Sequence, residues 1–380
     1  MAGIENQSKH RWIENAAGLA DLGRVLEDRQ SMALDSESNS GFAYHEKLCL
    51  LQINDGTDVW LVDLPALPGG RDGLESLRPM LEASTYEIQL HGGEFDVGCL
   101  KRDYGIDLRG VWDSQQAASF LGWQKTGYGA VVDEICGVRL PKAHTLHDWS
   151  SRPVTGEVLQ YAINDVQYLP KVVAKLKDRV RAADLEEEVL IACGAVETAT
   201  WNGGFKPEGL WSVKGVRQLS GEAQRILVSL YAWRETAAEA LDLPAGRTLN
   251  NELMIALARN APSRMEELKR LGVPKRVMAE WSSELLQVLS EAQRTPPELP
   301  PQPPRRALDR QVQKRGDRLK KWRRMEAERR QVPMQVVLPV AALRHLQRYG
   351  GGELELVPQL GAKRIERYGE VLVRLASTPT

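Results

Sequence analysis

The sequence is poor in cysteine and has no long apolar run. Its four cysteines, Cys49, Cys99, Cys136 and Cys193, are widely spaced and form no C-x-x-C pair, which argues against a zinc knuckle or a disulfide framework. We expect buried, reduced thiols. No uninterrupted apolar stretch approaches the ~20 residues that span a bilayer, and the polar N-terminus is not followed by an apolar leader core. We therefore expect a cytoplasmic protein with no membrane partner.

A net charge of one sign is also missing, because 50 Lys+Arg nearly balance 51 Asp+Glu. The balance hides a division along the chain. Residues 1–180 hold 18 basic and 26 acidic side chains, a net charge of −8, whereas residues 181–380 hold 32 and 25, a net charge of +7. An acidic half joined to a basic half indicates two parts with different roles. The length of 380 residues, 42% of them hydrophobic and 27% charged, fits a globular chain of two or three domains.

The first 180 residues carry patterns of both strands and helices. Strands are predicted at 32–34, 48–53, 59–64, 86–90 and 110–112, and the first three of them form a meander. Helices are predicted at 13–26, 74–81, 94–104, 114–121, 128–136 and 155–180. Antiparallel strands followed by alternating strands and helices indicate an α/β domain in which helices cover a mixed sheet.

From about residue 215 the strand signal disappears. Helical patterns occupy 219–241, 251–258, 277–289, 340–345 and 362–375. Six prolines in the nine positions 296–304 are typical of a semi-rigid linker, and residues 305–330 carry twelve basic and four acidic side chains. We predict an α/β domain at 1–200, a helical domain at 210–292, a proline-rich and basic linker at 293–310, and a second helical domain at 311–380.

Five residues in the acidic half carry the pattern of a metal site. Asp35 and Glu37 lie two apart at the end of a predicted strand, so both side chains point to one face. Two carboxylates on one face repel each other unless a cation lies between them. Tyr161 and Asp165 are spaced i, i+4 and share a helix face, and Asp96 follows a strand at the start of a helix. The alternatives are a solvated Asp-x-Glu loop and, for Asp96, an acid that complements the helix dipole.

These residues carry a resemblance to the 3′–5′ exonucleases that have four acidic residues and a tyrosine. The three motifs of that superfamily are resembled, in order, by Met32-Ala-Leu-Asp35-Ser-Glu37, Leu90-His91-x4-Asp96-Val97 and Tyr161-x3-Asp165-Val-x-Tyr168-Leu169. The intervening Trp112-Asp113-Ser-Gln115 and Asp148-Trp149-Ser-x-Arg152-Pro153 resemble the ribonuclease D family in particular. One departure is Ser36, where the family usually has threonine.

The resemblance continues into the basic half. Lys214-Gly215-x3-Leu219, Leu230-x2-Trp233-Arg234-Glu235 and Asp242-Leu243-Pro244 resemble the helicase-and-ribonuclease-D C-terminal domain, abbreviated HRDC. The segment 318–375 resembles a second, more divergent copy. The resemblance implies a ribonuclease H-like exonuclease domain followed by two HRDC-type domains.

A two-metal hydrolytic mechanism is what the resemblance implies for the acidic residues. It assigns Asp35, Glu37, Asp96 and Asp165 as ligands of two divalent cations, and Tyr161 as the residue that positions the attacking water. Carboxylates without a histidine or cysteine cluster suit Mg²⁺ or Mn²⁺, and no organic cofactor is expected. The implied products are nucleoside 5′-monophosphates, released one at a time from a 3′ end.

The substrate implied by the family is RNA with a free 3′ end, such as a transfer-RNA precursor. Residues with a possible role in binding it are His91, Gln115, Lys320, Lys321, Arg323 and Arg324. A strand-end histidine also fits a structural role, and a basic helix also fits a solvated surface. Two other functions stay open: a DNA-directed 3′–5′ exonuclease, and an RNA-binding protein without catalysis. We expect a monomer.

Overall fold

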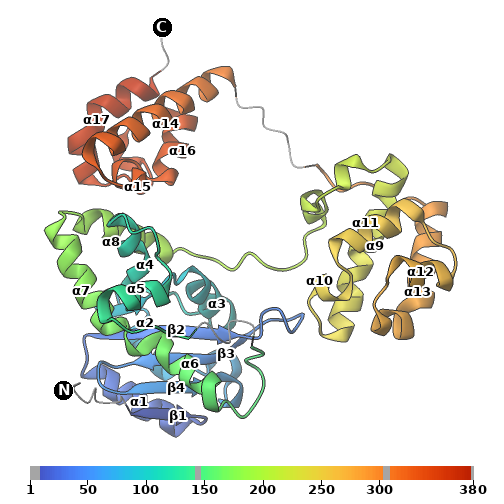
Figure 1. The fold of residues 1–380 in the computed structure, drawn as a ribbon, viewed down its shortest axis with the longest axis horizontal. Helices are drawn as coiled ribbons and strands as arrows, with labels where there is room; N and C mark the ends of the chain where they lie inside the picture. Colours follow the sequence, from blue (N-terminus) through green and yellow to red (C-terminus); the bar gives the residue numbers. More distant parts are fainter. Residues whose placement is uncertain (1–8, 142–146, 303–308, 378–380) are drawn as a thin grey trace. The chain divides into compact units, whose positions relative to one another are not determined.

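The computed structural model describes residues 9–141, 147–302 and 309–377. The chain forms two compact units (Figure 1). The first comprises Met1–Ser38, Leu48–Trp201 and Ala307–Thr380, and the second comprises Asn39–Lys47 and Asn202–Arg306. No helix within the described ranges is both long and apolar enough to cross a membrane.

A six-stranded mixed sheet is the centre of the first unit. Its strands are β1 (His10–Ile13), β2 (Ser31–Ser38), β3 (Leu48–Asn54), β4 (Val59–Asp63), β5 (Glu87–Leu90) and β6 (Val111–Asp113). Their order in the sheet is β1-β4-β3-β2-β5-β6. The pairs β2–β3 and β3–β4 are antiparallel, which confirms the predicted meander, and the other pairs are parallel. Strand β1 was not predicted, since its polar residues His10 and Arg11 hide the strand pattern.

Helices cover both faces of this sheet, and the sheet separates two apolar clusters. One face packs under α1 (Ala16–Glu27) and α3 (Glu94–Tyr104), and its cluster includes Met32 and Leu34 of β2. The other face packs under helices that carry Ala117, Val131, Ala162, Val172 and Val189, and its cluster includes Ala33. These helices are α4 (Ser114–Phe120), α5 (Tyr128–Cys136), α6 (Gly156–Gln167), α7 (Leu169–Ala182) and α8 (Glu186–Val196). Because side chains alternate along a strand, Asp35 and Glu37 share the face of Ala33.

The structure differs from the predicted helices of this domain at 74–81, which is a 3₁₀ turn followed by a helix of four residues, and in two further places. The helix predicted over 155–180 is two helices, α6 and α7, which meet at Tyr168. Pro170 causes the break, because it lacks an N–H and its ring collides with the carbonyl four residues earlier. Helix α8 was not predicted at all. Short elements between β4 and β5 are η1 (Leu64–Ala66), η2 (Gly70–Asp72), η3 (Glu75–Leu77) and α2 (Arg78–Leu81).

The second unit is all-helical, as predicted. Its elements are η4 (Pro207–Ser212), η5 (Val216–Gln218), α9 (Gly221–Leu241), α10 (Ala245–Thr248), α11 (Asn251–Asn260), α12 (Met265–Leu271) and α13 (Lys275–Arg294), packed around one apolar cluster. The loop 39–47, which connects β2 to β3, also belongs to this unit. Its Tyr44 N–H donates to Asp242 at 3.1 Å, and its Phe42 ring lies 4.6 Å from the Arg247 guanidinium.

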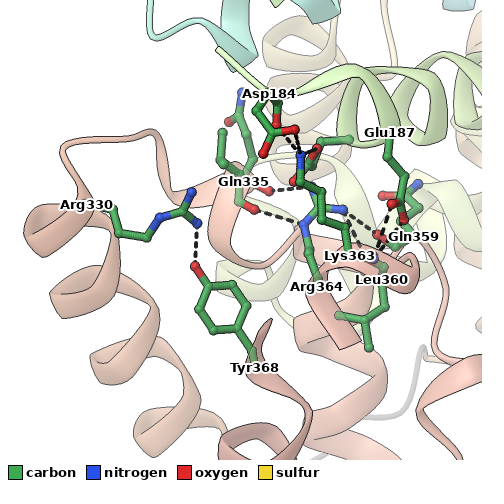
Figure 2. A network of polar contacts seen from close by, with 11 residues as sticks. Asp184, Glu187, Arg330, Gln335, Gln359, Leu360, Lys363, Arg364 and Tyr368 are labelled. Atoms are coloured by element: carbon green, nitrogen blue, oxygen red, sulfur yellow. Dashed lines mark hydrogen bonds and ion pairs between the residues drawn. The ribbon is translucent and has the colours of Figure 1, made fainter. Parts of the chain in front are cut away.

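The C-terminal helices belong to the first unit and have a core of their own. They are α14 (Arg310–Arg330), α15 (Met334–Val337), α16 (Val340–Tyr349), η6 (Leu354–Leu356) and α17 (Ala362–Ala376). Figure 2 shows how α17 meets α8 and the residues before it. Lys363 pairs with Asp184 at 2.6 Å and with Glu188 at 3.7 Å, and its N–H donates to Glu187 at 3.2 Å. These contacts attach the C-terminal helices to the α/β domain that contains the sheet.

A buried arginine organises the same region. Arg364 is 2% exposed and donates to the backbone carbonyls of Val336, Gln335, Gln359 and Leu360 (Figure 2). One guanidinium thus satisfies four carbonyls, two in the short helix α15 and two in the loop that precedes α17. The linker predicted at 293–310 lies in part outside the described residues.

Candidate metal centre

Three carboxylates from two elements meet beside the sheet. Ligand oxygens of Asp35, Glu37 and Asp165 all lie within 4.8 Å of one another. Asp35 and Glu37 come from β2, opposite Gln52 and Leu50 of β3. Asp165 comes from α6, which crosses this face of the sheet. The structure therefore brings together residues 130 positions apart in a spacing that a divalent cation can bridge.

Asp96 reaches the same region from the first turn of α3. The chain turns sharply after β5: Gly92 has φ +70°, and a side chain at Gly93 would collide with Leu90. Two glycines thus allow α3 to begin directly at the sheet edge. Ser36 donates its hydroxyl hydrogen to Asp96. Asp96 is outside the group of three, but its charge raises the pKa of Asp35, Glu37 and Asp165.

The raised pKa values of Asp35, Glu37 and Asp165 indicate that a bound cation would stabilise their ionised forms. Burial, followed by the charges of Asp96, Asp165 and Glu37, raises the pKa of Asp35 well above its usual value. Burial, followed by the charges of Asp165 and Asp96, raises the pKa of Glu37 to about 9. The pKa of Asp165 is raised by burial and then by Asp96. Carboxylates in this state hold protons at neutral pH unless a bound cation keeps them ionised. The donor set therefore fits a divalent metal, and oxygen ligands alone suit a hard ion.

Tyr161 lies on α6 one turn before Asp165 and faces the same charges. Burial raises the pKa of its hydroxyl far above the usual value, and the charges of Asp165, Glu37 and Asp35 raise it further. The ring packs against Trp149, with centroids 6.0 Å apart. A phenol in this state is neutral at physiological pH, so it serves as a hydrogen-bond donor or acceptor and not as a base.

A cavity of about 890 Å³ adjoins the carboxylates and contains Tyr161 and Asp165 in its wall. Tyr128, the cations Lys125 and Arg139, and the acidic Asp133 and Glu157 also line it, and Arg139 pairs with Asp133 at 3.8 Å. The sequence prediction missed Lys125, Tyr128 and Arg139, because nothing in the local pattern of α5 and its flanks distinguishes a cavity wall from an ordinary helix. It also missed the hydrogen bond from Ser36 to Asp96.

His91 and Gln115 contact neighbouring side chains and backbone, and not the cluster of Asp35, Glu37 and Asp165. The Nδ1 atom of His91 lies 2.8 Å from Ser114 Oγ, and its ring lies 5.2 Å from that of Tyr128. Burial lowers the pKa of His91 to about 4, against the opposing effects of Asp113 and a hydrogen bond to Thr126. The Gln115 side chain lies against Gly92. These contacts fit a structural role for both residues.

The four basic residues singled out in the sequence lie on α14 of the C-terminal helices. Lys320, Lys321 and Arg324 are exposed, whereas Arg323 donates to the Met334 carbonyl at 3.1 Å. Arg323 is therefore the least available of the four for a phosphate.

Comparison with known proteins defines the class of this site. Residues 10–181 match the family described as 3′-5′ exonuclease, and residues 223–289 and 313–375 each match the HRDC domain. The chain is thus a 3′–5′ exonuclease that carries HRDC domains, with the mixed sheet and helical domains that its sequence predicts.

Individual relatives narrow the assignment. Ribonuclease D of Nitrobacter hamburgensis is 28% identical over 375 residues, and the alignment covers 96% of this chain and 94% of that protein. Ribonuclease D of Escherichia coli is 28% identical over 302 residues, and the alignment covers 79% of each chain. The crystal structure of Escherichia coli RNase D, an exoribonuclease involved in structured RNA processing, superposes with a TM-score of 0.71 at 24% identity, covering 97% of this chain and 98% of that one. Over nearly its whole length the chain is thus similar to a protein named ribonuclease D.

Proposed function

We propose that this protein shortens RNA from its 3′ end by metal-dependent hydrolysis, releasing nucleoside 5′-monophosphates. The observation that carries the proposal is the group Asp35, Glu37 and Asp165, whose oxygens lie within 4.8 Å of one another and whose pKa values are raised by burial and by neighbouring carboxylates. The relatives named ribonuclease D support RNA as the substrate, with transfer-RNA precursors and other structured RNAs as the leading candidates.

Asp35, Glu37, Asp96 and Asp165 are the residues we propose as ligands of two Mg²⁺ or Mn²⁺ ions. When bound, such ions neutralise the scissile phosphate and lower the pKa of the attacking water. The Tyr161 hydroxyl, neutral at working pH, orients that water by a hydrogen bond. Ser36 holds Asp96 toward the site. Together these residues fix the direction from which the water attacks the phosphate. Holding the reacting groups in this geometry lowers the activation barrier.

The 890 Å³ cavity provides room for the terminal nucleotide next to Tyr161 and Asp165. Lys125 and Arg139 on its rim attract the phosphates of the strand. The exposed Lys320, Lys321 and Arg324 of α14 supply a further salt-sensitive attraction. We propose His91 and Gln115 as supports of the site and not as substrate contacts. The domain boundaries, the cytoplasmic location and the monomeric state predicted from the sequence stay proposals.

The test is digestion of a 5′-labelled RNA with a 3′ overhang, in Mg²⁺ and in Mn²⁺, beside a DNA of the same sequence. We expect a ladder that shortens from the 3′ end, 5′-monophosphate products, and faster loss of RNA than of DNA. Faster loss of DNA would favour the DNA-directed alternative. Binding without any product in either metal would favour a non-catalytic RNA-binding protein.

Asp35→Asn and Asp72→Asn form a matched pair for this test, because each removes one carboxylate from the same domain. Asp72 lies exposed on η2 and is not one of the three clustered carboxylates. Asp35→Asn should lower the rate at least about 10³-fold with the fold intact, and Asp72→Asn should retain full activity. Substantial RNA shortening by Asp35→Asn would refute the ligand assignment.

A further inference from the structure

The backbone on either side of Asp165 is held by two side chains from other elements. The first feature is the break between α6 and α7. Pro170 lies in the first turn of α7 and has no N–H, so the Val166 carbonyl lacks its usual partner four residues on. This carbonyl belongs to the residue that directly follows Asp165, and it accepts from the Tyr168 N–H at the C-cap of α6. A carbonyl oxygen has two lone pairs, so it can also accept from a donor elsewhere in the fold.

Asn54, the last residue of β3, supplies that donor. It is 5% exposed, and its Nδ2 donates to the carbonyls of Val166 at 3.1 Å and Gln167 at 3.3 Å. Its Oδ1 accepts from the Gly56 N–H at 2.8 Å. Because the carbonyls require a donor and the Gly56 N–H requires an acceptor, the orientation of the Asn54 amide is fixed. Since Asn54 pairs with Ala33 of β2, the strand that carries Asp35 is tied to the residue after Asp165.

Tyr128 supplies a second tie, on the residue before Asp165. Its hydroxyl donates to the Asn164 carbonyl at 3.1 Å. Its ring rests against His91, whose Nδ1 lies 2.8 Å from Ser114 Oγ. The Ser114 hydroxyl in turn donates to the carbonyl of Leu90 at the end of β5, at 2.9 Å. This chain of contacts runs from the strand that precedes Asp96 to the helix that carries Asp165 and Tyr161.

We propose that Asn54 and Tyr128 are positioning residues for the hydrolytic reaction, which hold Asp165 and Tyr161 against the carboxylates of β2 by binding the backbone on either side of Asp165. This inference rests on the proposed function. Neither residue is in the group of carboxylates, and both act through the backbone of α6. They connect the backbone of α6 to β3 and α5, and so help to set the distance between Asp165 and the carboxylates of β2.

Tyr128→Phe removes one hydroxyl and leaves the ring against His91. We expect kcat for a 3′-overhang RNA to fall roughly ten-fold with KM little changed. A shift of α6 misplaces Asp165 and Tyr161, whereas the bound RNA keeps its position. Tyr86→Phe is the matched control, since Tyr86 is a buried tyrosine of the same domain whose hydroxyl has no partner among the described residues. Its kcat should equal that of the wild type.

Asn54→Asp is the second variant, because it keeps the acceptor for Gly56 and removes the donors to Val166 and Gln167. It should show the same loss of kcat. Circular dichroism melts accompany each variant, so that activity is compared per folded molecule. If either variant melted lower but kept the wild-type kcat, the tie that it removes would be merely structural and the proposal would fail for that residue.

A double-mutant cycle with Tyr161→Phe separates positioning from an independent effect. If Tyr128 acts through α6, the combined loss of Tyr128→Phe and Tyr161→Phe is smaller than the product of the single losses. A combined loss equal to that product overturns the proposal. A wild-type protein that releases no nucleotide from any RNA would instead refute the proposed function, so the two failures are distinguishable.

Discussion

Replacing Glu37 by glutamine tests whether the acidic group strains the protein when no metal is bound. Burial, followed by the charges of Asp165 and Asp96, raises the pKa of Glu37 from 4.5 to about 9. The folded protein therefore holds this proton more tightly than the unfolded chain does. The stability that accompanies the proton is fully present below the unfolded pKa of 4.5 and is lost as the pH rises toward 9.

The size of the effect follows from the two pKa values. Between about pH 5 and about pH 8, linkage gives an upper limit of about 4 kcal/mol of lost stability in the metal-free protein. Relaxation and water entry, expressed as an effective dielectric constant near 20, reduce it to roughly 1–2 kcal/mol. For a domain of about 150–250 residues each kcal/mol moves Tm by about 2–4 °C. Glu37→Gln should therefore melt roughly 2–8 °C above the wild type at about pH 8.

The assay is thermal melting in chelator at about pH 5 and about pH 8, followed by melting in excess Mn²⁺. The two proteins should melt at similar temperatures at the lower pH. Metal should raise the Tm of the wild type more than that of Glu37→Gln, because the variant has lost one ligand. Asp72→Asn controls for the loss of any surface carboxylate. A Glu37→Gln protein that melts at or below the wild-type temperature at about pH 8 would refute the reasoning.

Three further outcomes are expected. Tyr161→Phe should lower kcat about 10²-fold while calorimetry finds unchanged metal affinity, and loss of metal binding would contradict its assignment to the water. The double variant Lys321→Ala, Arg324→Ala should weaken RNA binding and make its affinity less steeply dependent on salt, measured by filter binding; an unchanged salt slope would remove α14 from the substrate surface. Arg364→Ala leaves four backbone carbonyls without a donor and should destabilise the C-terminal helices by about 3 kcal/mol or more, seen as faster proteolysis there; equal protease resistance would contradict its structural role.

The period of two along β2 was sufficient to predict that Asp35 and Glu37 share one face, and the structure confirms it. That Asp165 joins them could not be derived from spacing, because it depends on how α6 crosses the sheet. The resemblance to a family was needed for that step and for Asp96. Pro170 was a signal for the helix break that the periodicity of 155–180 concealed.

Attachment of the C-terminal helices to the exonuclease domain lay beyond sequence reasoning. The ion pair between Lys363 and Asp184 joins residues 179 positions apart. In the sequence, neither residue differs from an ordinary solvated surface charge. The proline-rich run suggested a separate domain beyond it. Local patterns predict elements, whereas contacts of this kind depend on shape and charge that only the folded surfaces have.

The division of the chain into units has a consequence for how it can be shortened. Because residues 39–47 and 202–306 form one unit and the flanking segments form the other, the backbone passes between the units four times. A cut after Trp201 would therefore not release an intact nuclease. It would leave residues 39–47 without the helices on which Tyr44 and Phe42 rest, and would remove the partner of Asp184. A minimal version of the first unit needs an internal deletion instead of a truncation.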